Sequence, residues 1–342
     1  MNFSGEGPAD AGRKKRDFNP DEVVSIALDI CELMLENGAE VHRIEDTAER
    51  ICLAYGAEKV EIFAITSLIA ATITMKDGRD WTQTRRVYGS ANNMYIVEKL
   101  NALSRTICRD TPEPERVKAE IEDIRKRRAM PLPLKYLGGL MGAFGFAMFF
   151  GGTVFDGIMV VGLVVCLMDF NRPKYLNQIA CTALISAFAG VLITLISRFC
   201  GGWFPINTAV VSIAVIMLLI PGLALGNAVR DLLCGELVSG LVKMLQCILV
   251  AAAIAAGFTS VLIFTGGSTV PAPDAPGPAQ TALYTGLFTF GFSMLFSVSF
   301  KRLFYTSLGG MLCISSYLAA IEFLSGTEFP IVFTASAVAG LL

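Results

Sequence analysis

The stretch IPGLALGNAVRDLLCGELVSG, residues 220–240, joins two long apolar segments of the chain. Pro221 and Gly222 interrupt the first apolar run and would free helix-end backbone groups to meet a substrate. Ionisable side chains follow at once, although such groups are costly at the edge of a bilayer and are usually kept facing water, a substrate or one another. Many transporters expose helix ends to their cargo at broken helices of this kind. The stretch therefore predicts a transport site.

The polar residues of this stretch suggest separate roles in binding and in coupling. Arg230 would hold a substrate carboxylate through two parallel hydrogen bonds, and Asn227 would bond to an amide-like or hydroxyl group. Asp231 or Glu236 would be the carboxylate that carries the coupled proton. The alternative is that Arg230 and Asp231 form a charge pair that sets the topology at the inner membrane surface.

The composition places most of the charge in the first part of the chain. The hydrophobic fraction is 54% and charged residues make up 17%, yet residues 1–133 hold 20 of the 28 Lys and Arg and 23 of the 30 Asp and Glu. This distribution predicts a polar domain followed by a membrane domain. We expect a lipid bilayer and a small carboxylate-bearing molecule as partners, and no nucleic acid. The nine cysteines form no CxxC pair and there is one histidine, so we expect no metal site and no cofactor.

The first 130 residues divide into a tail and a folded domain. Residues 1–19 include RKKR at 13–16 and are expected to be a disordered basic tail. Residues 20–130 predict an α/β domain on the cytosolic side, opened by Asn19 as an N-cap and Pro20 in the first helical position. The pattern predicts two helices ending near 37 and 55, strands at 59–65, 67–75 and 81–87, and helices at 91–108 and 113–129.

The second predicted helix carries a polar motif of unknown role, His42, Arg43, Glu45 and Asp46. Glu45 and Asp46 lie three and four residues after His42, a spacing that could orient an imidazole for catalysis. We favour the alternative, an exposed helix face of mixed charge, because no Ser or Cys nucleophile has a recognisable spacing. We therefore do not expect an enzyme, and the alternatives for this domain are a hydrolase or a regulatory module.

Eight apolar runs follow, at about 134–152, 155–169, 176–197, 205–220, 239–264, 281–300, 303–324 and 331–342. Residues 134–265 predict five membrane spans, of which the second and fourth are short. Cations fall in alternate loops, which places the N-terminal domain in the cytoplasm. Glycines of the first span, Gly138, Gly142 and Gly145, would allow close helix packing, and Asp156 would be solvated at the outer surface.

The membrane domain contains two pairs of similar segments. GFAMFF at 145–150 resembles GFSMLF at 291–296, and SAFAGVL at 186–192 resembles SAVAGLL at 336–342, at offsets of 146 and 150 residues. Five spans separate the partners, so the copies would have opposite orientations, as in many secondary transporters. The fold class expected is thus a polytopic α-helical membrane protein with inverted five-helix repeats, in which residues 281–342 form an incomplete second repeat. We expect a homo-oligomer or a missing complementary membrane unit.

Three long motifs resemble the threonine/serine exporter family: LMLENGAEVHRIEDTAERICLAYG at 33–56, EKVEIFAITSLIAATI at 58–73 and PGLALGNAVRDLLCGELVSG at 221–240. That family also includes split two-subunit relatives implicated in succinate export. The resemblance covers about 20–265 as the larger unit, and 281–342 look like the start of the smaller unit. It implies an exporter driven by the proton-motive force in a prokaryotic plasma (inner) membrane, carrying either amino acids of the threonine/serine type or C4-dicarboxylates.

Overall fold

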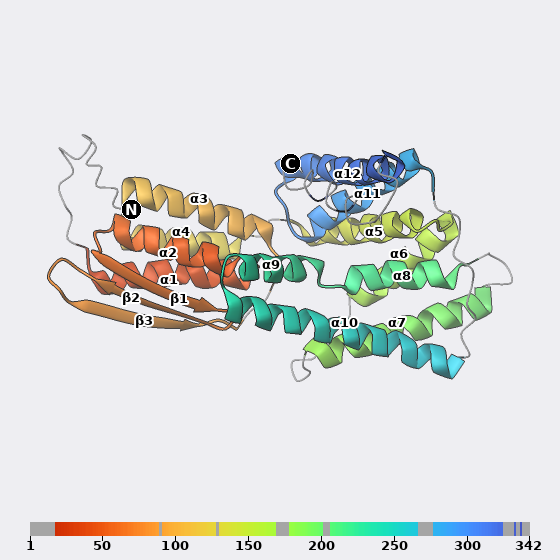
Figure 1. Ribbon diagram of the computed structural model, residues 1–342, viewed down its shortest axis with the longest axis horizontal. Helices are drawn as coiled ribbons and strands as arrows, with labels where there is room; N and C mark the ends of the chain where they lie inside the picture. Colours follow the sequence, from red (N-terminus) through yellow and green to blue (C-terminus); the bar gives the residue numbers. More distant parts are fainter. Residues whose placement is uncertain are drawn as a thin grey trace.

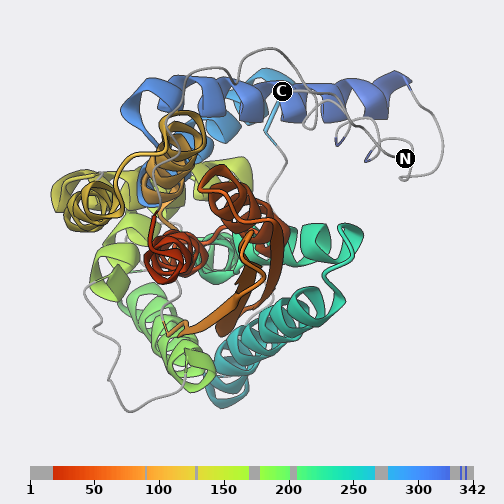
Figure 2. The same cartoon turned by 90° about the vertical axis from the view of Figure 1, so that its left-hand side faces the viewer.

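The computed structural model describes residues 18–88, 91–127, 130–168, 178–200, 206–265 and 276–323, together with residues 332 and 336. The described part forms an elongated molecule, with an α/β domain at one end and a group of long helices at the other (Figure 1). Seen from the end of the α/β domain, the long helices surround the axis on which that domain lies (Figure 2). The expected basic tail up to residue 17 and the similar segment at 336–342, apart from Ser336, lie outside the described residues.

The α/β domain follows the predicted order of helices and strands. Its elements are α1 (Pro20–Glu36), α2 (Val41–Ala54), β1 (Lys59–Ile65), β2 (Leu68–Thr74), β3 (Asp80–Arg86), α3 (Met94–Asp110) and α4 (Pro114–Lys126). The Asn19 side chain accepts a hydrogen bond from the Asp21 amide, which confirms it as the N-cap of α1. The three strands form an antiparallel sheet in the order β1-β2-β3, and the apolar sides of α1, α2 and α3 supply most of the core.

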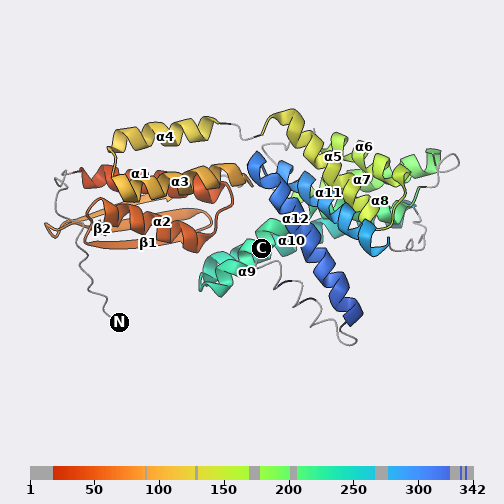
Figure 3. The ribbon, with the colours of Figure 1, turned by 90° about the horizontal axis from the view of Figure 1, so that it is seen from above.

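The remaining helices, which form the other end of the molecule, are α5 (Leu132–Phe149), α6 (Val154–Met168), α7 (Gln178–Cys200), α8 (Thr208–Leu219), α9 (Gly222–Leu233), α10 (Leu237–Thr265), α11 (Pro278–Leu295) and α12 (Phe300–Phe323). Four of them, α5, α7, α10 and α12, are long and apolar enough to cross a bilayer, and α8 with α9 makes a fifth candidate. The expected short second and fourth runs are the helices α6 and α8. Figure 3 shows α12 extending obliquely from the bundle, and little of its surface is buried.

Helices α5 and α11 form the closest helix pair of the membrane domain. A Cβ atom added at Gly145 would lie 2.8 Å from the backbone nitrogen of Phe288, and one added at Gly291 would overlap the backbone nitrogen of Gly142. The ring of Phe146 stacks on that of Phe288 at 4.2 Å between centroids. The glycines of the first span therefore allow close packing, as predicted, and their partner is the sixth predicted span.

The two helices also begin and end at equivalent positions and are followed by similar turns. Helix α5 runs from 132 to 149 and α11 from 278 to 295, an offset of 146 residues at both ends. In each case the second residue after the helix has a positive φ, Gly151 at 78° and Ser297 at 55°. The next amide in each case donates back into its helix, Gly152 to the Ala147 carbonyl and Val298 to the Ser293 carbonyl.

Asp156 is buried, in contrast to the expected solvated position. Its side chain has no exposed surface and accepts hydrogen bonds from the Thr153 amide and hydroxyl at 2.8 and 2.9 Å and from the Asn207 amide at 2.7 Å. One carboxylate therefore caps the start of α6 and fixes the turn before α8. Burial without partners would be costly, and the three donors explain why the group is tolerated here.

Candidate substrate and coupling site

The chain bends by 49° between α8 and α9. Pro221 has no amide hydrogen to donate, so the helical hydrogen-bond ladder stops, and the Gly222 amide instead donates to the Ile220 carbonyl at 2.9 Å. Helix α9 starts immediately afterwards, with the Leu225 amide bonded to the Pro221 carbonyl. The predicted break is thus present, and it separates two short helices, each of 12 residues.

Two of the predicted substrate ligands contact the α/β domain. The Asn227 side-chain amide donates to the Gly38 carbonyl at 3.0 Å. The Arg230 guanidinium pairs with the Glu40 carboxylate at 2.9 Å. Both acceptors belong to the loop between α1 and α2, where Gly38 adopts a φ of 92° that favours glycine. The guanidinium has further donors to offer, because 66% of the Arg230 side chain is exposed.

Asp231 is almost completely buried, with 1% of its surface exposed. One carboxylate oxygen accepts from the Val41 amide at 3.2 Å, and the other pairs with the Lys243 ammonium at 2.7 Å. Helix α2 starts at Val41, and its N-cap residue Glu40 makes no capping hydrogen bond with its own side chain. Asp231 therefore supplies from the membrane domain the cap that α2 lacks, while Glu40 reaches out to Arg230.

Glu236 and the start of α10 lie near the end of β1. The Ser239 hydroxyl donates to the Ala64 carbonyl at 3.5 Å, and the Ala64 amide donates to the Glu45 carboxylate at 2.7 Å. Burial raises the pKa of Glu45 above its ordinary value, and the nearby Glu236 raises it further, against the opposing effects of the Ala64 amide and of His42. The two predicted proton carriers thus lie on one junction with the α/β domain, Asp231 in an ion pair and Glu236 beside a second carboxylate.

The residues of the polar motif on α2 make contacts with separate partners. His42 is exposed, and neither of the carboxylates that follow it accepts a hydrogen bond from its ring among the described contacts. Asp46 pairs with Arg50 at 2.8 Å, and Arg43 donates to the Asn101 side chain at 3.2 Å. Within the described residues, no group of three or more metal-ligating side chains comes together. The motif is a helix surface of mixed charge, divided between the junction and a cleft toward α3.

A second junction ties α3 to the turn between α11 and α12. Glu98 accepts from the Ser299 hydroxyl at 2.5 Å and pairs with Arg302 at 3.1 Å, and the Met94 amide donates to the Phe296 carbonyl. Sequence reasoning missed Glu98 and Glu40 because their partners lie about 200 residues away along the chain. One signal was available for Glu40: a glutamate is a poor N-cap, so α2 needed a capping group from elsewhere.

Comparison with known protein families shows the family of the chain. The sequence model of the family described as "Putative threonine/serine exporter" matches residues 25–265, which is more than half of the chain. The chain belongs to this family. The match extends from α1 to the end of α10, and so contains both the broken span and the loop of the α/β domain that it contacts.

Two curated relatives resemble the exporter over most of their length. Both are named "Probable succinate transporter subunit YjjP"; the one from Klebsiella aerogenes is 25% identical over 234 residues, which cover 65% of this chain and 85% of the relative. The one from Escherichia coli strain K12 is 24% identical over 246 residues, 68% of this chain and 91% of the relative. No solved structure shows a significant match. As a member of this exporter family, the protein is a membrane transport protein with transmembrane helices.

Proposed function

We propose that the protein is a secondary transporter that exports small carboxylate-bearing metabolites, with amino acids of the threonine/serine type as the first candidates. The export would cross a prokaryotic plasma membrane, driven by the proton gradient, with the α/β domain in the cytoplasm. Family membership supports transport. The positions of Lys243 and Arg302, on the side of the membrane helices that contacts the α/β domain, agree with the cytoplasmic assignment.

One observation carries the assignment of the binding site: the guanidinium of Arg230, next to a helix break, is already occupied by a carboxylate. Glu40 takes one of its donors at 2.9 Å and leaves most of the side chain exposed. A substrate carboxylate would compete for the same donors, because an Arg fork binds any carboxylate in the same geometry. Substrate binding would then displace Glu40 and loosen the contact between α9 and the α/β domain.

The proton would act on the adjacent carboxylate. Protonation of Asp231 would remove the charge that pairs with Lys243 and would weaken the cap on α2. Glu236 remains a second candidate, because it lies close enough to Glu45 for the two charges to repel each other. Substrate and proton would thus act on neighbouring contacts of one junction, and this proximity is how the two could be coupled.

Transport also requires a conformational change that opens the site to each side of the membrane in turn, and we propose that it occurs at the break between α8 and α9. Added Cβ atoms at Gly222 and Gly226 would meet no atom within 4 Å, so this side of α9 has room to move. We further propose that α5 with α6 and α11 with α12 are inverted repeats. The identical offset of their boundaries and the equivalent left-handed residues after α5 and α11 support this proposal.

A C4-dicarboxylate such as succinate is the second candidate substrate, favoured by the names of the two relatives. Those names describe subunits, so we also propose that the protein acts with a second copy or a complementary membrane unit. A dicarboxylate needs a second cation besides Arg230, and Lys243 would become available if Asp231 were protonated.

Counterflow distinguishes the substrates. Everted membrane vesicles from cells that produce the full chain would be preloaded with unlabelled serine, threonine or succinate, and the entry of the labelled compound would be followed. We expect counterflow for one class of compound. In vesicles that are not preloaded, net uptake of the same compound should collapse when a protonophore is added. Equal signals in vesicles with and without the protein, for all three compounds, would refute the proposal.

A further inference from the structure

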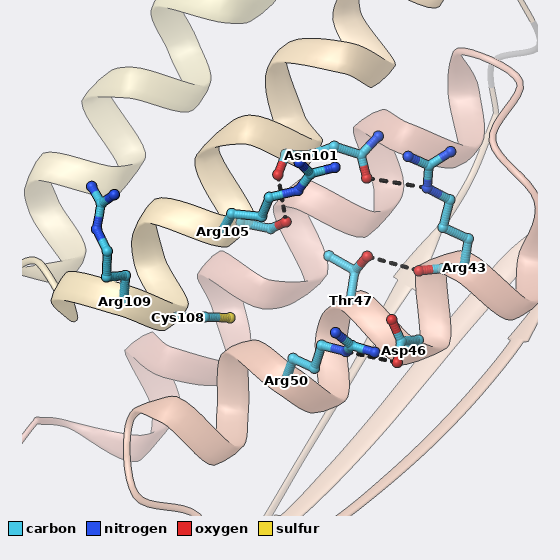
Figure 4. Close-up of a pocket in the computed structure, with 9 residues that line it drawn as sticks. Arg43, Asp46, Thr47, Arg50, Asn101, Arg105, Cys108 and Arg109 are labelled. Atoms are coloured by element: carbon cyan, nitrogen blue, oxygen red, sulfur yellow. Dashed lines mark hydrogen bonds and ion pairs between the residues drawn. The ribbon is translucent and has the colours of Figure 1, made fainter. Parts of the chain in front are cut away.

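A cleft of the α/β domain, separate from the junction with α9, has the properties of a ligand site. It lies between α2 and α3, has a volume of about 490 Å³ and is lined by polar residues from both helices (Figure 4). This volume is in the range of small-molecule sites, which makes it far too small for a macromolecule. From its charge and its donors, we infer that the cleft binds a small anion with two or more negatively charged oxygens.

The charge of the cleft is strongly unbalanced. Four arginines line it, Arg43 and Arg50 on α2 and Arg105 and Arg109 on α3, against the single carboxylate of Asp46. Their spacing of seven and of four residues places each pair on the side of its helix that faces the other helix. Guanidinium groups bind carboxylate and phosphate oxygens in pairs of parallel hydrogen bonds. Arginines that face each other therefore suit an anion with two or more negatively charged oxygens.

Two of the four arginines, Arg43 and Arg105, pair with no carboxylate among the contacts of the described residues. Arg50 pairs with Asp46, and Arg109 pairs with Asp110 beside the cleft at 2.9 Å. Arg43 uses only its Nε, which donates to Asn101, so its two terminal nitrogens remain. Among the contacts of the described residues, Arg105 makes no hydrogen bond and no ion pair. An anion would therefore bind chiefly between Arg43 and Arg105.

The floor of the cleft is polar but carries no charge that would repel an anion. Asn101 and Thr47 are buried, and their side chains donate to the carbonyls of Val97 and Arg43, respectively, at 2.7 Å each. Cys108 points into the gap between the helices (Figure 4), and burial raises the pKa of its thiol, which keeps it neutral. The floor is thus rigid and neutral, and the arginines at the rim provide the attraction.

Isothermal titration of the full chain in detergent tests the inference, with inorganic pyrophosphate and succinate as separate probes at low salt. We expect at least one probe to bind, and Arg43→Gln and Arg105→Gln each to weaken that binding about tenfold. The matched control is Arg116→Gln, an exposed arginine of α4 away from the cleft. Asp46→Asn should strengthen binding, because it releases Arg50 and removes the one negative charge of the lining.

The probes also identify the ligand and separate this site from the proposed transport site. Pyrophosphate binding that depends on Arg105 indicates a phosphate-bearing ligand. Succinate binding that depends on Arg105 and persists in Arg230→Gln indicates a dicarboxylate held in the cleft. If neither probe binds at millimolar concentration, or if binding is the same in the two glutamine variants and in the Arg116 control, the inference is wrong. All five substitutions lie at exposed or half-exposed positions, so loss of the fold would not explain the result.

Discussion

Asp231 caps the helix that starts at Val41, 190 residues earlier in the chain. The residues next to them, Arg230 and Glu40, form an ion pair across the same gap. Two adjacent positions of α9 are therefore bonded to two adjacent positions at the start of α2. This double contact links the segment with the helix break to the α/β domain.

The stability effects of substitutions in the buried ion pair between Asp231 and Lys243 should be strongly coupled. Asp231→Asn keeps an oxygen for the Val41 amide but leaves the Lys243 charge without a partner, at an expected loss of about 3 kcal/mol in unfolding free energy. Lys243→Gln should lose a similar amount. The double variant Asp231→Asn/Lys243→Gln should recover most of the loss, because neither charge is then left buried alone. Additive losses in thermal or denaturant unfolding would contradict the pairing.

Glu45 should limit stability at neutral pH. Its pKa is raised in the folded protein, so the folded state holds the proton more tightly and loses stability as pH rises through the ordinary value and then the raised value. Glu45→Gln removes this loss, and the amide oxygen can still accept from Ala64. We expect a midpoint of thermal unfolding about 1–2 °C higher at neutral pH, and a flatter pH dependence of that midpoint in the acid range. Glu49→Gln, an exposed position of the same helix, is the control and should change neither.

The turn after α11 should gain stability from a glycine. Ser297 has a φ of 55°, which favours glycine, and its buried hydroxyl has no hydrogen-bond partner among the described residues. At the corresponding turn after α5 the residue is already Gly151, with a φ of 78°. Ser297→Gly should raise the unfolding free energy by about 1 kcal/mol. Gly151→Ser should lower it; a loss of stability in Ser297→Gly, or a gain in Gly151→Ser, would argue against the equivalence of the two turns.

The packing of α5 on α11 should be intolerant of a single methyl group. Gly291→Ala would drive a Cβ into the Gly142 backbone, and Gly145→Ala would place one 2.8 Å from the Phe288 nitrogen. Each should destabilise the protein by about 1–3 kcal/mol, because backbone atoms move apart less readily than side chains. Gly309→Ala on α12 meets no atom within 4 Å and serves as the control. Unchanged unfolding in the first two variants would mean that the helices pack less closely than described.

Local signals predicted the elements well, whereas contacts between distant segments could not be predicted. Asn19 and Pro20 fixed the start of α1, and the β-branched run from Lys59 matched the first strand, because caps and side-chain alternation act over a few residues. Asp156 was predicted to be solvated since nothing near it in sequence indicates the Asn207 amide. The partner of Arg230 could not be predicted either, because an arginine beside a helix break could pair with a substrate or with Glu40.

The central claim is that Arg230 binds the substrate carboxylate and does not serve only to hold α9 on the α/β domain. The charge-exchanged variant Glu40→Arg/Arg230→Glu separates the two roles. It restores an ion pair across the junction, but it removes the cation from α9, where the substrate carboxylate would bind. Exposed Arg198, changed to Gln, is the control for loss of a cation elsewhere in the membrane domain.

The deciding measurement is counterflow of the transported carboxylate in vesicles that carry either single variant, the exchanged pair or the control. The thermal stability of each variant is measured alongside it. We expect the exchanged pair to be more stable than the single variants, while its counterflow stays at least about tenfold below that of the unaltered protein. Recovery of counterflow together with stability would show that Arg230 only joins the two domains and would contradict the claim.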